Sequence, residues 1–297
     1  MIADEVEKNK EIKALISLID DPDETVYTEV FDKLIKEGQN AIPLLEKAWE
    51  NSLQPEIQNR IETITHQIQF ESVCNDLEMW LNTEMDVLSG SLIVARYQYP
   101  NLTENEIRYE INKLRKDIWI ELNDNLTALE QIKVFNHIFY EVFGFKGDNT
   151  NYHSPQNSYI NIVLNSRKGN PLSLGIIYMI LSQSLELPIY GVNLPEHFVL
   201  AYTAKSLDPD TLTINDKNVL FYINAFSGGA VLSYKEIEDF LRKLDLEPIP
   251  PYFNPCSNLD IIKRMINNLI LSYEKNGEKS KVKELKVLKS IIEPKKP

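Results

Sequence analysis

Apolar residues recur every three or four positions through the first 70 residues, which predicts helices and leaves little sign of β-strands. Asp20-Asp21-Pro22-Asp23 breaks the first helix, and Gly38 ends the second. The predicted helices cover residues 9–19, 26–37, 41–51 and 56–70, and we expect the last one to continue further. Two helix pairs of this length resemble a HEAT-like repeat, with a simple helical extension of the main domain as the alternative.

The helical pattern continues from 71 to 150, and a change of texture follows. Residues 146–171 are rich in Asn, Ser, Gly and Pro, as loops are. The predicted elements after residue 150 are helices at 159–164, 172–185, 235–244, 259–275 and 279–291, with strands at 188–193, 198–203 and 219–224. We therefore predict an α+β fold that is predominantly helical.

Three regions follow from this pattern. Residues 1–70 form the HEAT-like helical region, 71–250 form the main domain, and 251–297 contain a terminal, TPR-like helix pair after a Pro-rich connector. Trp49, Trp80 and Trp119 occupy apolar helical positions, so we expect all three in the core.

The charge balance excludes some partners. The 297-residue chain has a net charge of -13, which disfavours nucleic acid and anionic membranes. The N-terminus does not resemble a secretory signal, and the chain has no apolar window of transmembrane length. We therefore expect a cytoplasmic protein. Cys74, Cys256 and four scattered histidines lack metal-site spacing, so we expect no metal or cofactor. A protein partner is the remaining expectation, and the oligomeric state stays open.

Candidate chemistry begins at the apolar helix near residue 172. Pro171 suits the first helical position, where its missing N–H has no cost. Ser173 would then lie in the first turn, where the helix dipole activates a nucleophile. The alternative is that Ser173 only satisfies a free backbone N–H.

Two strand positions complete the candidate site. His197 opens one predicted strand and Asn224 closes the next. A nucleophile at a helix start, followed by His and then Asn or Asp on successive strands, is the order of a papain-like triad. The alternative for His197 is a core histidine with a satisfied partner.

Four linked motifs resemble the SirB-type transglutaminase-like family, within the papain-like transglutaminase superfamily. The resemblance covers roughly residues 75–250, and the family usually carries TPR-like helices after this domain. The motifs are NSYIN at 157–161, RKGNPLSL at 167–174, GVNLPEHF at 191–198 and NAFSGG at 224–229.

The resemblance implies a degenerate active site. The superfamily's Gly-x-Cys falls on Gly169-Asn170-Pro171, its histidine on His197 and its aspartate on Asn224. Proline has no nucleophilic atom, so the nucleophile position is lost. The positions implied to line the cleft or bind a substrate are Asn157, Tyr159, Asn170, Pro171 and Pro195.

Three functions fit these residues. The first is a non-catalytic, regulatory module that binds a protein through the cleft or the helical flanks. The second is a cysteine-less hydrolase or acyltransferase that uses Ser173, His197 and Asn224. The third is a scaffold in which these residues are only core elements.

Overall fold

A computed structural model describes residues 2–83, 85–123, 125–204 and 219–293. The chain divides into two compact units, Met1–Glu78 and Met79–Pro297, which are described separately below. The sequence-based boundary at residue 70 lies inside helix α4 (Pro55–Leu81), which continues past this point as expected.

The first unit is entirely helical within the described residues. The predicted helices are confirmed, because apolar stripes from all of them share one core that includes Ile12, Leu34, Leu45 and Ile64. Asp23 caps the second helix by accepting a hydrogen bond from Thr25 N–H. The helices are α1 (Ile2–Ile16), α2 (Glu24–Glu37), α3 (Ile42–Asn51) and the beginning of α4.

The second unit contains the predicted α+β arrangement, and the chain is mostly α-helical with small sheets. Its sheet is antiparallel in the order β3-β4-β5-β6, and a separate parallel pair joins β1 to β2. The strands are β1 (Lys146–Gly147), β2 (Lys168–Gly169), β3 (Ile189–Leu194), β4 (His197–Thr203), β5 (Val219–Asn224) and β6 (Ala230–Leu232). The three longer strands confirm the prediction, whereas β1, β2 and β6 are too short to produce an alternating pattern.

The helices of this unit also follow the apolar spacing. They are α5 (Val87–Gln98), α6 (Glu104–Glu121), α7 (Ala128–Asn136) with a π-helical continuation (His137–Val142), α8 (Ile160–Ser166), α9 (Pro171–Gln183), α10 (Tyr234–Lys243), α11 (Asn258–Asn276) and α12 (Lys279–Ile292). Within the described residues, every helix is too short or too polar to cross a lipid bilayer.

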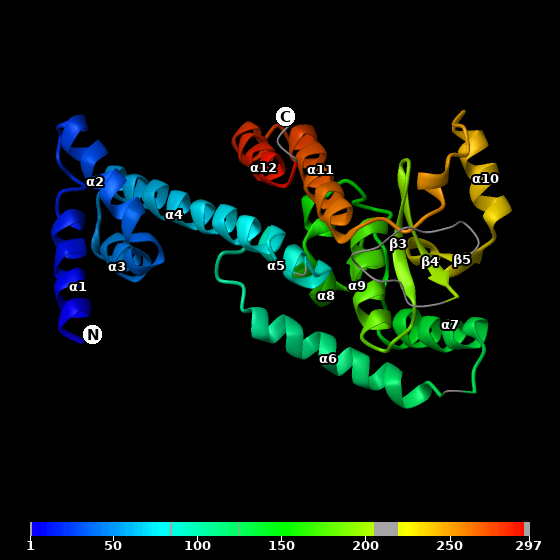
Figure 1. The fold of residues 1–297 in the computed structure, drawn as a ribbon. Helices are drawn as coiled ribbons and strands as arrows, with labels where there is room; N and C mark the ends of the chain where they lie inside the picture. Colours follow the sequence, from blue (N-terminus) through cyan, green and yellow to red (C-terminus); the bar gives the residue numbers. More distant parts are fainter. Residues whose placement is uncertain (1, 84, 124, 205–218, 294–297) are drawn as a thin grey trace. The chain divides into compact units, whose positions relative to one another are not determined.

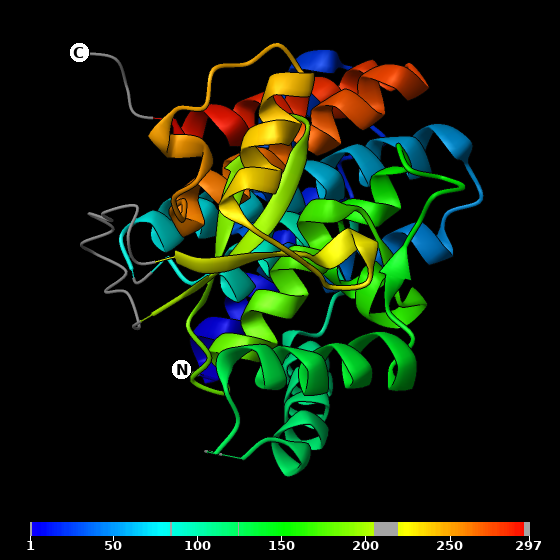
Figure 2. The ribbon, with the colours of Figure 1, turned by 90° about the vertical axis from the view of Figure 1, so that its right-hand side faces the viewer.

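Helix α9 is the centre of the second unit, and nearly all of its residues are buried. It lies beside β3 and β4 (Figure 1), and Gly175 allows close contact because a Cβ there would lie 2.7 Å from the Phe198 ring. Helix α10 covers the other face of the sheet (Figure 2), and its Ile237 and Leu241 share a buried cluster with Val192 and Val199 of the sheet. The unit therefore has three layers, with the sheet between α9 and α10.

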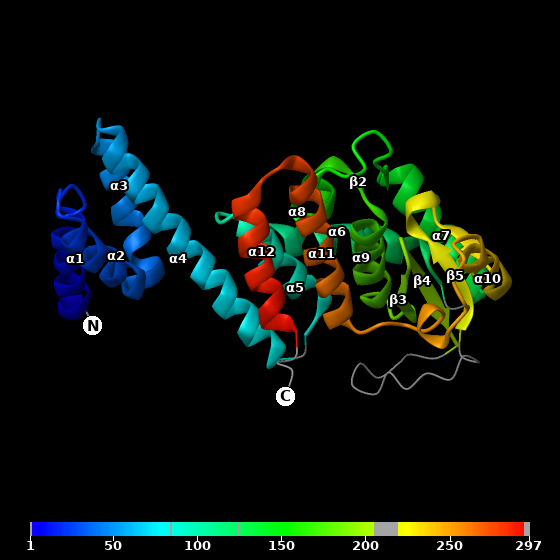
Figure 3. The same cartoon turned by 90° about the horizontal axis from the view of Figure 1, so that it is seen from above.

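Helices α11 and α12 belong to the same compact unit as the sheet. Helix α11 lies next to α9 (Figure 3). A buried hydrogen bond joins the hydroxyls of Tyr159 and Tyr273 at 3.0 Å, and the Tyr273 hydroxyl also donates to Gln98 at 3.0 Å. Helix α11 thus forms part of the surroundings of α9.

The prediction of three core tryptophans is wrong for Trp49 and Trp119. Trp80 is 3% exposed, but Trp119 is 63% exposed and Trp49 is 39% exposed. The buried stripe of α6 ends at Ile118, and the next residue turns about 100° away from it. Apolar character alone did not identify the buried face.

Candidate functional site

The chain enters α9 through a tightly constrained turn. Helix α8 ends at Arg167, which has a left-handed φ of 57°. The β1–β2 pair follows, with Asp148 N–H donating to Gly169 O at 3.0 Å. A Cβ on Gly169 would lie 2.6 Å from Ser173 Oγ, so only glycine leaves room for that hydroxyl. This geometry fixes the first turn of α9.

The first turn of α9 is closed by a capping box. Asn170 Oδ1 accepts a hydrogen bond from Ser173 N–H at 2.9 Å, and Ser173 Oγ accepts one from Asn170 N–H at 3.0 Å. Pro171 occupies the first helical position, as predicted. Ser173 is only 3% exposed, so its hydroxyl is an internal part of the cap.

His197 stands at the start of β4, directly after a two-residue turn. The turn consists of Pro195 and Glu196, and Glu196 has a φ of 57°. His197 is half-buried, and desolvation lowers its pKa below the ordinary value of 6.5. The Asn224 side chain partly opposes this shift, whereas the positive charge of Arg264 adds to it. His197 is therefore predominantly neutral at pH 7.

Asn224 lies at the end of β5 as predicted, and it has a second task. Its Oδ1 accepts hydrogen bonds from Phe226 N–H at 3.1 Å and Ser227 N–H at 3.2 Å. These bonds cap the short 3₁₀ turn after β5. Asn224 therefore combines a structural role with its interaction with His197.

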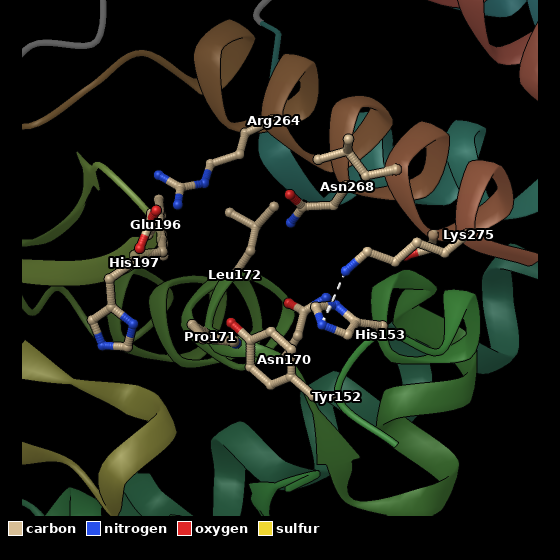
Figure 4. A pocket seen from close by; sticks show the side chains of 13 residues that line it. Tyr152, His153, Asn170, Pro171, Leu172, Glu196, His197, Arg264, Asn268 and Lys275 are labelled. Atoms are coloured by element: carbon tan, nitrogen blue, oxygen red, sulfur yellow. Dashed lines mark hydrogen bonds between the residues drawn. The ribbon is translucent and has the colours of Figure 1, made fainter. Parts of the chain in front are cut away.

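A cavity of about 490 Å³ opens at the start of α9. Three elements and one loop form its walls: the first turn of α9, the start of β4, one face of α11 and the segment before η3 (Pro155–Ser158). Figure 4 shows these side chains around the opening. The lining residues are Tyr152, His153, Asn170, Pro171, Leu172, Glu196, His197, Phe198, Arg264, Asn268, Leu271, Ser272 and Lys275.

Helix α11 supplies a wall that the sequence-based hypothesis missed. Its lining residues are Arg264, Asn268, Leu271, Ser272 and Lys275, which follow one another at helical spacing along one stripe. This spacing is visible in the sequence. Only the packing of α11 beside α9 shows that the stripe faces a cavity.

The α11 wall is positively charged. The Arg264 Nη1 donates to Leu194 O at 2.8 Å and to Asn193 Oδ1 at 3.2 Å. Lys275 Nζ lies 3.0 Å from His153 Nε2, at the exposed side of the cavity. Of the described residues that line the cavity, Glu196 is the one carboxylate.

The predicted site residues separate into two groups. Asn170, Pro171 and His197 line the cavity, whereas Asn157, Tyr159, Ser173, Pro195 and Asn224 do not. Asn157 is buried and donates from Nδ2 to Asn151 O at 2.7 Å. Asn157 and Tyr159 thus stabilise the frame behind the cleft.

In the part of the chain that the structure describes, His197 has no hydroxyl or thiol partner. Among the described residues, no serine, threonine or cysteine side chain hydrogen-bonds to His197. Cys256 lies outside the cavity lining, and burial raises the pKa of its thiol to about 12. In the part of the chain that the structure covers, no three His, Cys, Asp or Glu side chains gather as a metal site requires.

Comparison with known proteins agrees with this fold. Residues 105–267 match the family model described as Transglutaminase-like superfamily. A UPF0162 protein of Xylella fastidiosa (strain 9a5c) is 27% identical over 192 residues, which cover 62% of this chain and 64% of that protein. The F-box only protein 21 of Mus musculus is 24% identical over 202 residues, which cover 68% of this chain and 30% of that protein. No solved structure matches the chain.

Proposed function

Because this chain belongs to the transglutaminase-like superfamily, we propose that it is a non-catalytic member whose cleft binds a protein segment. The observation that carries this proposal is Pro171, which lines the cavity at the position where the family resemblance implies the nucleophile. A proline side chain can neither attack a carbonyl nor accept a proton.

Ser173 does not replace the missing nucleophile. A catalytic hydroxyl must lie within about 2.6 to 3.2 Å of its base, or somewhat further without substrate. The Ser173 hydroxyl is instead bonded to the backbone of Asn170 and is buried behind Gly169. Two residues along a helix also turn about 200°, so Ser173 and Pro171 face different directions.

The cleft retains features that suit binding. Leu172, Phe198 and Leu271 give it apolar contact area, and His197 and Asn268 give it hydrogen-bonding groups. We also infer that the chain is a SirB-type member with HEAT-like and TPR-like flanks, because helices α1 to α4 precede the matched region and the pair of α11 and α12 lies at its end, with α11 overlapping it. Helical flanks of this type commonly offer binding surfaces.

A turnover experiment tests the non-catalytic part of the proposal. The purified chain is incubated with peptide, amide and ester substrates, and with a glutamine donor and an amine acceptor. We expect no product beyond that of the His197→Ala variant. Turnover that is lost in His197→Ala, or labelling of Ser173 by a fluorophosphonate, would refute the proposal.

A selection experiment tests the binding part. Random peptides displayed on phage are selected on the wild-type chain and then measured on Asn268→Trp, which fills the cavity. Asn267→Trp is the matched control, because its neighbouring position on α11 is outside the cavity lining. We expect selected peptides to lose affinity for Asn268→Trp alone. Equal affinity for both variants would place binding outside the cleft.

A further inference from the structure

We propose that the bound segment is acidic and extended, with one carboxylate held by Arg264 and a second held by Lys275. This inference rests on the proposed function, because it names the class of segment that enters the same cleft. The spacing, the charge and the apolar centre of the lining residues on α11 support it.

The two cations stand on one face of α11 at the two ends of the stripe. They are eleven residues apart, which corresponds to about 16 Å along the axis and only about 20° around it. Figure 4 shows both side chains extending from α11 over the start of α9. A single small anion cannot contact both ends, whereas an extended chain can.

Arg264 has no carboxylate partner among the described residues. Its hydrogen-bond partners there are two neutral oxygens, Asn193 Oδ1 and Leu194 O, both bonded to Nη1, and its guanidinium carbon lies 5.8 Å from the centre of the Phe198 ring. No carboxylate of the described residues pairs with its guanidinium, although burial is strong enough to lower its pKa. Neutral oxygens compensate only part of the hydration that a half-buried cation loses. A ligand carboxylate would add a charged partner through the Nη2 and Nε hydrogens, which bond to no described residue.

Lys275 is equally available. Its contact with His153 Nε2 uses one of the three ammonium hydrogens. The whole chain carries a net charge of -13, so this local concentration of cations opposes the general charge of the protein. Two cations without a carboxylate partner among the described residues favour an acidic ligand at this face. The net charge of the chain would repel the many phosphates of a nucleic acid more strongly than the two carboxylates of a short segment.

The centre of the stripe defines the middle of the segment. Leu271 is 57% exposed and faces the cavity together with Leu172. Alternate residues of an extended chain point to the same side, and residues i and i+4 are about 13 Å apart. A segment with acidic residues at i and i+4 and an apolar residue at i+2 therefore matches the stripe. The flexible Lys and Glu side chains cover the difference between this span and the spacing of the two cations along α11.

The experiment uses two synthetic peptides and the full chain. Acetyl-Glu-Ser-Leu-Ser-Glu-amide is compared with acetyl-Gln-Ser-Leu-Ser-Gln-amide, and binding is followed by NMR at the α11 amides and the His197 ring. We expect saturable binding of the Glu peptide, at least about ten-fold weaker binding of the Gln peptide, and weakening of the Glu complex by added salt. Inorganic phosphate should compete only weakly.

Charge variants identify the residues. Lys275→Gln and Arg264→Gln should each reduce affinity for the Glu peptide several-fold, with Arg264→Lys intermediate. Lys263→Gln is the matched control, because it removes the same charge from α11 outside the cavity lining. Lys275 is exposed, so its variant keeps the test valid even if Arg264→Gln disturbs β3.

Three results would overturn the inference. They are no saturable binding of the Glu peptide up to about 10 mM, equal binding of both peptides, or equal losses in Lys275→Gln and Lys263→Gln. Neutral peptides selected by display that still depended on Asn268 would refute the acidic inference and leave the proposed function intact. Turnover of any peptide would instead refute the proposed function.

Discussion

Replacing Ser173 by alanine separates a structural serine from a catalytic one. The substitution removes the oxygen that accepts the Asn170 N–H at 3.0 Å, in a place where both residues are less than 9% exposed. Leaving a buried donor without a good partner costs about 1 to 3 kcal/mol. The weaker contact of the same N–H with Asn157 O, at 3.5 Å, remains available. We therefore expect a loss of about 1 to 2 kcal/mol in unfolding free energy.

The assay is urea unfolding followed by tryptophan fluorescence. A Trp49→Phe background leaves Trp80 and Trp119 as reporters, and both belong to the second unit. Ser184→Ala is the control, because this exposed serine at the other end of α9 donates to a backbone carbonyl. The Ser184→Ala substitution should change the free energy of unfolding by less than about 0.5 kcal/mol. Equal stability of Ser173→Ala and the control would refute the capping argument.

The remaining predictions concern titration and reactivity. NMR titration should give His197 a pKa below 6.5, and Asn224→Ala should lower it further because Asn224 favours the charged ring. As the pH falls, the unfolded state takes up this proton before the folded state does, because the pKa of His197 is lower in the folded protein. The stability contributed by neutral His197 is therefore complete above about pH 6.5 and is lost as the pH falls below that value. Urea midpoints of the wild-type chain and of His197→Gln at several pH values measure this loss. Cys256, with a pKa of about 12, should react with iodoacetamide far more slowly at pH 8 than a free cysteine does, and mass spectrometry measures this rate. Pro171→Cys should create a thiol that reacts faster than Cys256 and slows when His197 is also replaced by alanine; equal rates with and without His197 would contradict the assigned register.

The sequence predicts the elements well and the cleft only in part. Pro171 identifies the start of α9 because the preference for proline at the first helical position is a local property. Ser173 stays ambiguous, since a nucleophile and a cap occupy the same turn. The fate of its hydroxyl depends on Gly169 and the backbone around it, which sequence patterns do not describe.

The missing wall of the cleft has a different cause. Arg264 and Lys275 lie on a helix that the apolar spacing predicts, and the apolar residues Ile262, Met265, Leu269 and Tyr273 of that helix are buried. The polar side faces a cavity only because α11 packs beside α9. Such tertiary packing has no signal within α11 itself. Trp119 is a second example of this limit, because it is exposed where the buried stripe of α6 ends, one residue after Ile118.

If the cleft binds a segment without catalysis, the peptides that it binds must remain chemically unchanged. Peptides selected on the wild-type chain are incubated with it at saturating concentration and are then examined by mass spectrometry. We predict that these peptides bind the wild-type chain, lose affinity for the Asn268→Trp variant, and are recovered intact. Cleaved or transferred peptide that forms with the wild-type chain and not with His197→Ala would show that the cleft catalyses a reaction.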